Sequence, residues 1–576
     1  MVKLLIETGK RLLDIVLENI SKLSAFDKVF VIEAPTGYGK SVGAPAIAAL
    51  NHEKEFSFNF IHVLPLRAIV EDLYICKYLY ALGVQSSECN RAPPKAFCEA
   101  LRVLGVSEKD VAYQMGFDYM LRGVGRKEPT YDAKVVISTL DSFAYNFLRI
   151  PVTELFREVK HYATPRARIF TATLFLDEVH MINRFEDEAS DNVLALLKVL
   201  IEFSLVTQTP LVMASATLWS AFRNSIRQWS KDRVVFFTIS KEDSKSGTHI
   251  CVRDREYENL AKSVKWRTSI VDEKDLLSKV VEHVEKGERV LVVRDRISDA
   301  VDLYSKLALK EDEKALLHGR LCLGDRERAL EKSKNAKVVV ATPMIEAGVD
   351  WDFDVGFRDA TNIPSIVQVF GRVCRNRTDC EGEVYLVKTS NSLGSLLDFV
   401  NNHKNIDWRI PYSYTSDRGE YVVGYQHILE LQKAEVRESP RAEIIFRGLI
   451  APIALPPSYI NTAIDEYGHS LLKKPLAQFY VHGVQGLKAA KSVYDVISST
   501  FTYTYDIVER GGKCVEGFAC IIEAGDTLDH EVYDWRKRYF ELQKSCVELA
   551  ASAKGKVIFS GFVLKAECYV KGVGFV

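Results

Sequence analysis

The stretch from Ala34 to Ser41, APTGYGKS, combines glycines, a lysine and a hydroxyl in an order that suits a bound phosphate. Glycine at positions 37 and 39 lets backbone N–H groups turn inward onto phosphate oxygens, where a side chain would obstruct them. Lys40 would place positive charge against the outer phosphates, and the Ser41 hydroxyl could bind Mg²⁺. We therefore predict a nucleotide-binding loop. Its residues would be Ala34, Pro35, Thr36, Gly37, Tyr38, Gly39, Lys40 and Ser41.

Two features of this loop leave an alternative open. Ala34 stands where the general phosphate-binding motif has its first glycine. A glycine-rich loop can also do no more than turn a strand into a helix.

A pair of carboxylates, Asp177 and Glu178, follows the apolar run from Ile169 to Leu176. Asp177 could hold Mg²⁺, directly or through water, and Glu178 could polarise an attacking water. An Asp-Glu pair is usually a solvated surface pair, but its place after a buried strand favours chemistry. His180, two residues on, would then act as a phosphate or interdomain sensor.

The elements that must position these groups follow an α/β pattern, in which β-branched runs alternate with helical stretches. A polar stretch from Lys241 to Gly247 is typical of a linker, and a second α/β set follows it. After about residue 390 the pattern becomes helical and then β-rich. We expect parallel-sheet domains at 1–240 and 241–390, and an accessory α+β domain at 391–576. The expected strands are Lys28–Glu33, Phe58–Leu64, Lys134–Ser138, Ile169–Leu176, Leu211–Ala214, Arg289–Arg294, Ala315–His318, Val338–Thr342 and Glu383–Lys388.

Composition limits the class of protein. The chain has 576 residues, 47% hydrophobic and 27% charged, which argues against a mostly disordered protein. The formal net charge is −1, so any positive charge for a polyanion must be local. No secretory signal and no apolar run of the ~20 residues that a membrane span needs is present. We expect a cytoplasmic protein without a membrane partner, whose 11 cysteines are reduced.

Seven segments occur in the order found in superfamily 2 helicases, and the chain resembles that superfamily. APTGYGKS resembles motif I, LPLRAIVEDL motif Ia, STLDSF motif Ic and FLDEVH motif II. SATL resembles motif III, ATPMIEAGVDWDFD motif V and QVFGRVCR motif VI. The resemblance implies two RecA-like domains with ATP bound between them.

The resemblance also implies roles for individual residues. Arg372 and Arg375 would be arginine fingers, which neutralise charge that develops on the phosphate. Gln368 would orient the attacking water. Gly348 and Asp350 would line the second domain's side of the cleft. Coupling residues would be His180, Ser215 and Thr217, and nucleic-acid backbone contacts would be Arg67, Thr139 and Thr342. Thr139 and Thr342 could instead cap helices, and Arg67 could be a surface charge.

Four details narrow the resemblance: Asp-Glu-Val-His, SATL, IEAGVDWDFD and LLHGRLCLGDR (Leu316 to Arg326) are similar to the CRISPR-associated helicase of type I interference. Val369 and Phe370 depart from its motif VI, where an Arg-Ala pair is common. The resemblance implies an ATP- and Mg²⁺-dependent 3′→5′ translocase on single-stranded DNA, recruited by an RNA-guided surveillance complex. Because no consecutive His-Asp pair occurs, we expect an HD-type nuclease to be a separate protein. The C-terminal domain would cap the channel and dock a partner.

Two other functions remain open: a DExH-type RNA helicase, and a nucleotide-switched nucleic-acid-binding protein that does not unwind. A metal-dependent nuclease site in the chain itself also remains open. Cys76, Cys89 and Cys98 lack a fourth ligand for an iron–sulfur cluster, and Cys514 and Cys520 could form a disulfide. Phe501, Tyr503 and Tyr505 alternate along a probable strand, which favours core packing over base stacking.

Overall fold

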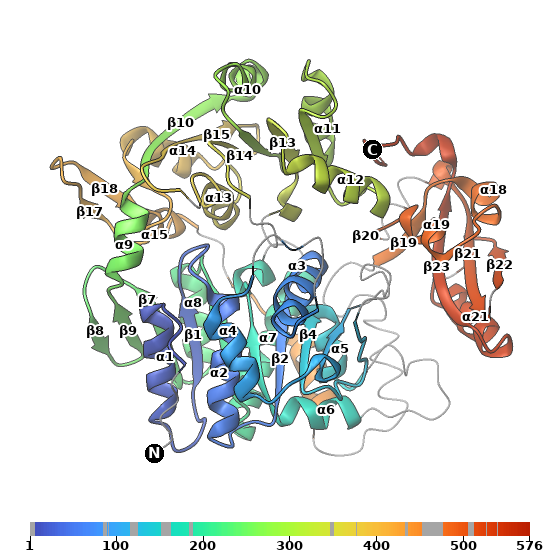
Figure 1. Ribbon diagram of the computed structural model, residues 1–576, viewed down its shortest axis with the longest axis horizontal. Helices are drawn as coiled ribbons and strands as arrows, with labels where there is room; N and C mark the ends of the chain where they lie inside the picture. The colour runs from blue at the N-terminus through green and yellow to red at the C-terminus, as the bar shows by residue number, and fades with distance from the viewer. Residues whose placement is uncertain are drawn as a thin grey trace.

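The computed structural model places two parallel sheets and a smaller antiparallel-rich sheet in separate parts of the molecule (Figure 1). The residues it describes are 6–84, 89, 92–115, 125–150, 163–183, 188–345, 351–375, 377–432, 436–451, 476–504, 508, 512–525, 527–537 and 539–575.

The first sheet has nine strands, and all neighbours are parallel except the pair at one edge. In spatial order the strands are β3 (Val111–Gln114), β4 (Val135–Thr139), β2 (Asn59–Leu64), β5 (Ala172–Leu176), β6 (Leu211–Ser215), β1 (Val29–Glu33), β7 (Val234–Ile239), β9 (His249–Val252) and β8 (Ser244–Ser246). The central strands are buried along their whole length, as expected for a sheet covered on both faces.

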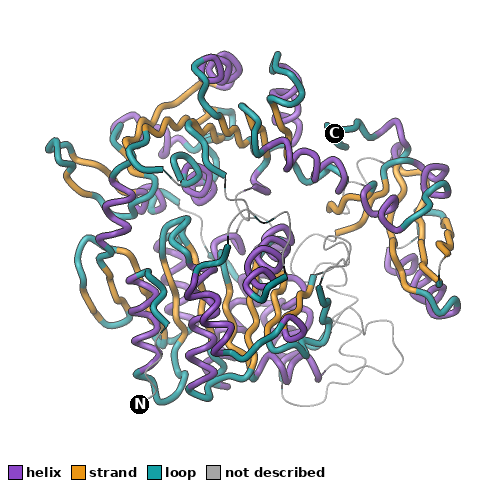
Figure 2. Tube along the Cα trace, in the orientation of Figure 1, coloured by secondary structure: helices purple, strands orange, loops and turns teal. Residues whose placement is uncertain are grey.

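Helices cover both faces of this sheet (Figure 2). Alternate residues of β1 point to opposite faces: Phe30 and Ile32 belong to one core, and Val29 and Val31 to the other. The first core includes residues of α1 (Arg11–Ser21), α2 (Lys40–Glu53), α3 (Arg67–Leu73) and α4 (Lys95–Val103). The second includes residues of α5 (Leu140–Phe147), α6 (Ala163–Phe170), α7 (Glu188–Thr207) and α8 (Ser220–Trp229).

The second sheet has six strands, all parallel. Their order is β10 (Lys265–Asp272), β15 (Glu381–Lys388), β14 (Val355–Asp359), β11 (Val290–Val293), β13 (Val338–Ala341) and β12 (Lys314–Leu317). Residues of α10 (Leu276–Glu285) and α11 (Ile297–Lys306) form the core on one face. Residues of α13 (Ile363–Phe370), α14 (Gly394–Asn402) and α15 (Tyr425–Leu429) form the core on the other, and α12 (Leu323–Ser333) packs against it.

The expected linker from Lys241 to Gly247 is wrong, because this stretch lies in a strand pair. β8 pairs antiparallel with β9, and β9 pairs parallel with β7, so the first sheet continues past residue 240. The polar composition misled the prediction, since β8 is an exposed edge strand whose residues bury nothing. The connection between the two sheets is α9 (Arg255–Lys262).

The described residues at 391–432 and 436–450 pack on the two parallel-sheet domains instead of forming a separate unit. A small sheet of β16 (Ile406–Asp407), β18 (Tyr421–Gly424) and β17 (Tyr414–Thr415) precedes α15, which lies in the second domain's core. The next helix, α16 (Pro440–Ile450), buries Ala442, Phe446 and Leu449 in the first domain's core beside α7. The accessory unit of the structure therefore begins later than residue 391.

That unit is a five-stranded sheet, drawn in orange and red in Figure 1. Its order is β20 (Thr500–Thr504), β19 (Leu476–Tyr480), β23 (Lys556–Leu564), β21 (Val515–Ala524) and β22 (Thr527–Tyr533), and it carries α18 (Gly483–Lys488), α19 (Val493–Ser498) and α21 (Tyr539–Ser552). Phe501 is buried in its core, as predicted. Tyr503 lies below the Arg320 guanidinium, 4.7 Å from ring centroid to carbon, and Tyr505 lies outside the described residues.

The last residues of the chain dock this unit onto the second domain. The Asp325 carboxylate accepts hydrogen bonds from the Tyr569 hydroxyl and the Gly572 amide, each at 2.8 Å. His318 Nε2 lies 2.6 Å from the Val573 carbonyl oxygen. Asp325 and His318 both belong to the LLHGRLCLGDR segment. The C-terminal unit therefore binds the second domain at this segment.

The structure joins eight cysteines in four disulfides, which corrects the expectation of reduced thiols. The pairs are Cys76–Cys89, Cys374–Cys380, Cys514–Cys568 and Cys520–Cys546, so Cys514 and Cys520 do not pair with each other. Cys98, Cys251 and Cys322 are free thiols. Spacing along the chain could not reveal these pairs, because Cys514–Cys568 and Cys520–Cys546 join separate elements, and spacing alone does not determine which cysteines pair.

None of the helices that the structure describes combines the length and apolar character that crossing a bilayer requires.

Candidate nucleotide site between the two parallel sheets

The predicted phosphate loop lies between β1 and α2, at the carboxyl end of the first sheet. Gly37 and Gly39 have φ values of 81° and 106°, a left-handed region that a side chain disfavours. Lys40 is 5% exposed, and its ammonium donates to the carbonyl oxygens of Ala34 at 2.9 Å and Pro35 at 3.3 Å. The loop thus presents backbone amides and one buried cation at the start of a helix, which is the arrangement that binds phosphate.

Asp177 follows β5 directly beside this loop. The Ser41 hydroxyl donates to the Asp177 carboxylate, and His62 Nε2 lies 3.5 Å from the same carboxylate oxygen. Burial raises the pKa of Asp177, but His62, Lys40 and Ser41 together outweigh burial and lower it below its ordinary value. An ionised carboxylate beside a serine hydroxyl is a set of hard oxygen ligands that fits Mg²⁺.

The backbone of Glu178 does not continue the extended conformation of the strand before it. Its φ is 52°, so the chain turns sharply after Asp177, and its amide donates to the Asp177 carboxylate at 2.9 Å. A non-glycine residue held in this region is a strained position of the kind that collects at active sites. Burial raises the pKa of the Glu178 carboxyl, with Lys40, Arg372 and Arg375 acting in the opposite direction. The two adjacent carboxyls therefore have pKa values shifted in opposite directions.

The predicted coupling residues form one cluster behind the carboxylates. His180 Nδ1 lies 3.0 Å from the Ser215 hydroxyl and 3.4 Å from the Glu178 carboxylate. The same hydroxyl accepts from the Thr217 amide at 3.1 Å, and the Ser215 carbonyl accepts from the Ala34 amide at 3.1 Å. The SATL segment is thus bonded both to the carboxylate segment and to the phosphate loop.

Residues of the second domain complete the site. The Thr36 hydroxyl donates to Gln368 Oε1 at 2.9 Å, and Gln368 Nε2 lies 3.5 Å from His180 Nε2. A Cβ placed on Gly37 would lie 3.6 Å from Arg375 Nε. Arg372 is 2% exposed, and its charge acts on Glu178. Groups separated by more than 330 residues therefore meet at one place, with Arg375 beside the phosphate loop and the charge of Arg372 acting on Glu178.

The backbone that carries these arginines is held by side chains that sequence reasoning missed. Arg377 binds Asp352 at 3.0 Å and Asp354 at 2.5 Å, and Asp352 also accepts from the Arg375 amide at 3.0 Å. His62 was missed as well. Its signal was an ionisable residue inside the apolar strand NFIHVL, where a buried charge needs a partner.

The three residues that were predicted to contact nucleic acid, Arg67, Thr139 and Thr342, lie in different parts of the structure. Arg67 lies at the start of α3, and its Nη1 donates to the Thr502 hydroxyl of β20 at 3.4 Å. Thr139 caps α5, where its hydroxyl accepts from the Ser142 amide at 3.4 Å, as the alternative interpretation allowed. Thr342 is buried at the end of β13, and its amide donates to the Leu317 carbonyl at 3.0 Å. Gly348 and Asp350 lie outside the described residues.

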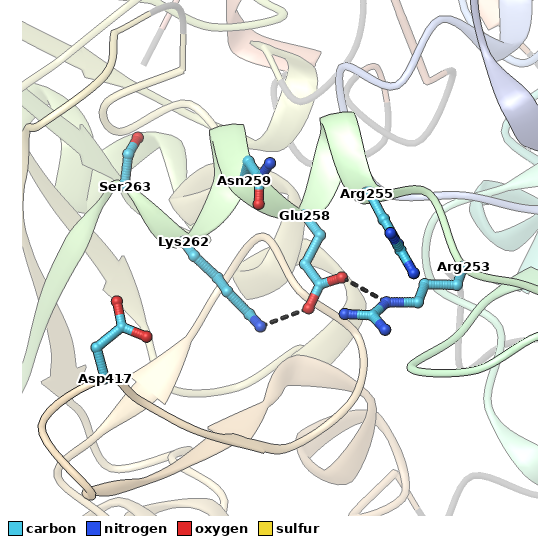
Figure 3. A pocket seen from close by; sticks show the side chains of 7 residues that line it. All are labelled: Arg253, Arg255, Glu258, Asn259, Lys262, Ser263 and Asp417. Carbon is cyan, nitrogen blue, oxygen red and sulfur yellow. Dashed lines mark hydrogen bonds and ion pairs between the residues drawn. The ribbon is translucent and has the colours of Figure 1, made fainter.

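A cavity of about 520 Å³ lies on the outer face of α9 (Figure 3). Its Glu258 carboxylate binds Arg253 at 3.0 Å and Lys262 at 2.5 Å. None of its lining residues belongs to the predicted nucleotide site.

Comparisons with known proteins find sequence similarity to CRISPR-associated nuclease/helicases. Residues 286–378 match the family model described as CRISPR-associated nuclease/helicase Cas3, C-terminal. The CRISPR-associated nuclease/helicase Cas3 of Methanothermobacter thermautotrophicus is 25% identical over 368 residues, which cover 61% of this chain and 39% of that protein. The subtype I-F/YPEST Cas3 of Pseudomonas aeruginosa is 32% identical over 106 residues, 18% of this chain and 10% of that protein.

The fold is also similar to that of a Cas3 protein. The crystal structure of T. fusca Cas3 with ATP superposes with a TM-score of 0.53 at 15% identity, over 86% of this chain and 63% of that one. The chain resembles Cas3 in sequence and in fold. The predicted CRISPR-associated resemblance is therefore confirmed, and so are the two RecA-like domains. The chain spans less than two thirds of the Cas3 proteins that it matches.

Proposed function

We propose that this Cas3-like chain hydrolyses ATP and uses the energy to move along single-stranded DNA in the 3′→5′ direction. The observation that carries the proposal is the meeting of Gln368, Arg372 and Arg375 from the second domain with the phosphate loop and carboxylates of the first. A site completed only when both domains meet couples hydrolysis to domain movement.

In this proposal each group has a role that its surroundings support. The amides of the phosphate loop and Lys40 bind the phosphates, and Ser41 with Asp177 would hold Mg²⁺, which neutralises phosphate charge when bound. Glu178 accepts a proton from the attacking water, and Gln368 orients that water. Arg372 and Arg375 neutralise the charge that develops on the transferred phosphoryl group. By their place in motif V, Gly348 and Asp350 would line the second domain's side of the cleft.

Movement would pass from the site to the strand through the coupling cluster. His180, Ser215 and Thr217 connect the carboxylates to the phosphate loop. A displacement of the carboxylates would therefore displace the phosphate loop as well. Arg67, Thr139 and Thr342 would hold the phosphodiester backbone, which positions a strand without reading its sequence. We further propose that the chain is cytoplasmic and works with an RNA-guided surveillance complex and a separate HD-type nuclease.

The first test is steady-state ATP hydrolysis without nucleic acid, with single-stranded DNA and with single-stranded RNA. We expect stimulation by DNA that is lost in Lys40→Ala. Glu178→Gln should lower kcat by about 10²–10⁴-fold while nucleotide still binds, since it removes only the proton acceptor. Stimulation by RNA alone would favour the RNA helicase, and unchanged turnover in Glu178→Gln would refute the assignment of the base.

Direction is tested separately by displacement of streptavidin from oligonucleotides biotinylated at either end. A 3′→5′ motor displaces streptavidin from the 5′ end only. Hydrolysis without displacement from either end would favour the nucleotide-switched binder.

A further inference from the structure

The first turn of α9 contacts the phosphate loop through a buried tyrosine. The Tyr38 hydroxyl donates to Asp254 Oδ2 at 2.6 Å and accepts from the Leu12 amide at 3.0 Å. Asp254 is the N-cap of α9, where its other oxygen accepts from the Tyr257 amide at 3.0 Å. One carboxylate therefore joins the phosphate loop to the helix that connects the two sheets.

The same turn contacts the second domain through Tyr257. Its ring meets the Tyr38 ring edge to face, with centroids 5.3 Å apart, and its hydroxyl donates to the Arg409 carbonyl oxygen at 2.8 Å. Asp407 fixes this part of the chain by accepting from the Arg409 and Ile410 amides at 2.8 and 2.9 Å. Tyr257 and Arg409 are each under 10% exposed.

Arg409 then reaches the backbone of the arginine fingers. Its Nη1 donates to the Cys374 carbonyl at 3.2 Å, and its Nη2 donates to the Arg375 carbonyl at 3.4 Å. The planar guanidinium is suited to hold two neighbouring carbonyls at once, which an ammonium cannot do with the same geometry. The chain of contacts runs from Tyr38 through Asp254, Tyr257 and Arg409 to Arg375.

We propose that this buried chain of hydrogen bonds is a coupling device, in which Asp254, Tyr257 and Arg409 are positioning residues for the arginine fingers. This inference rests on the proposed ATP hydrolysis. The chain of hydrogen bonds connects the phosphate loop to the arginine fingers through protein groups alone, in addition to the connection through a bound nucleotide. A buried polar group that loses its hydrogen-bond partner costs free energy. Displacement of the phosphate loop therefore disfavours the engaged position of the finger segment. Displacement of the finger segment likewise disfavours the bonded position of the phosphate loop.

The test is a double-mutant cycle on Tyr38→Phe and Arg409→Lys, both of which keep most of the packing. Each single variant should lower kcat about five-fold or more with KM for ATP nearly unchanged. The double variant should lose no more than the worse single variant, because both break one device. Tyr304→Phe is the matched control, since it also removes one hydrogen bond of a largely buried tyrosine, at 2.9 Å to Glu311. Losses that multiply, as they do for independent sites, would overturn the proposal.

Hydrogen exchange without nucleotide gives a readout that does not depend on hydrolysis. Tyr38→Phe should speed exchange of the amides at 371–375, and Arg409→Lys should speed exchange at 37–41, whereas Tyr304→Phe should change neither. If the wild-type protein hydrolyses no ATP, the proposed function fails and exchange alone decides the coupling. Exchange that stays unchanged at both distant segments would refute it.

Discussion

At the scale of residues, the two adjacent carboxyls of the candidate site have different surroundings. Asp177 lies against His62, Lys40 and Ser41, which lower its pKa and so favour the ionised form that the proposed metal site needs. For the partly buried Glu178, burial outweighs the opposing charges of Lys40, Arg372 and Arg375, and its raised pKa brings it closer to the neutral pH at which a general base is most effective. Opposite pKa shifts in one pair are a known sign of divided acid and base roles.

This difference predicts the pH dependence of hydrolysis. Only the ionised Glu178 can accept a proton, so the rate falls as pH drops through its pKa. Since the pKa is raised from the ordinary 4.5, the acidic limb of the kcat profile should lie above pH 4.5. Measuring kcat at saturating ATP from about pH 5 to about pH 9 checks this, and the limb should vanish in Glu178→Gln. A rate that is flat down to pH 5 would contradict it.

At the scale of elements, the docking of the C-terminal unit depends on a neutral histidine. His318 Nε2 faces the Val573 carbonyl, and its Nδ1 accepts from the Arg320 amide at 3.1 Å, so Nδ1 must carry no proton. Burial lowers the pKa of His318 from 6.5 to about 4. Docking therefore selects the uncharged ring.

Acidification should then loosen the C-terminal unit. The undocked histidine binds a proton below about pH 6.5 and the docked one only below about pH 4, so docking weakens as pH falls through this interval. Above pH 6.5 both forms are neutral and docking is constant. Fluorescence energy transfer between dyes on α21 and α11 would report separation. His318→Gln, which keeps a neutral polar side chain, should remove the pH dependence, and an unchanged dependence in that variant would assign it elsewhere.

Nine strands of the two parallel sheets could be predicted because burial makes them continuous apolar runs. The buried strands β7 and β14 were missed, and the strand expected at Ile169–Leu176 was predicted too long, since Ile169 and Phe170 belong to α6. Edge strands such as β8 could not, since a strand that buries nothing leaves no hydrophobic pattern. The candidate nucleotide residues Lys40, Glu178 and Arg375 could be named because they belong to local motifs, and the structure brings their charges together. His62 and Arg409 act only through contacts between distant segments, and no local spacing marks such contacts.

At the scale of the whole molecule, a disulfide stabilises the C-terminal unit. Cys514–Cys568 spans 54 residues, most of the five-stranded sheet. Closing a loop of that length lowers the entropy of the unfolded chain by an amount worth about 4 kcal/mol. Cys514→Ser should lower the unfolding temperature of this unit in calorimetry, and a reductant should have the same effect. Cys98→Ser, which changes a free thiol, is the control. Equal melting of both variants would exclude this stabilisation.

Removal of the unit tests its proposed role in partner recruitment. Among the described residues, all the fully buried members of the parallel-sheet cores precede residue 451, and the last of them is Leu449 of α16. A chain that ends at residue 451 should therefore bind ATP with unchanged affinity but fail to join the surveillance complex in a gel-shift assay. Recruitment by the truncated chain would place the partner's surface on the parallel-sheet domains.

The helix between the sheets has a further consequence for how the fingers reach the nucleotide. Residues 253–264 are all that separate β9 from β10, and the eight of them in α9 span about 12 Å. Such a short, stiff tether keeps the fingers at a high effective concentration next to the phosphates, much as a short linker favours the second contact of a bivalent ligand. Lengthening the tether with glycine and serine after Lys262 would dilute the fingers without altering any residue that touches ATP.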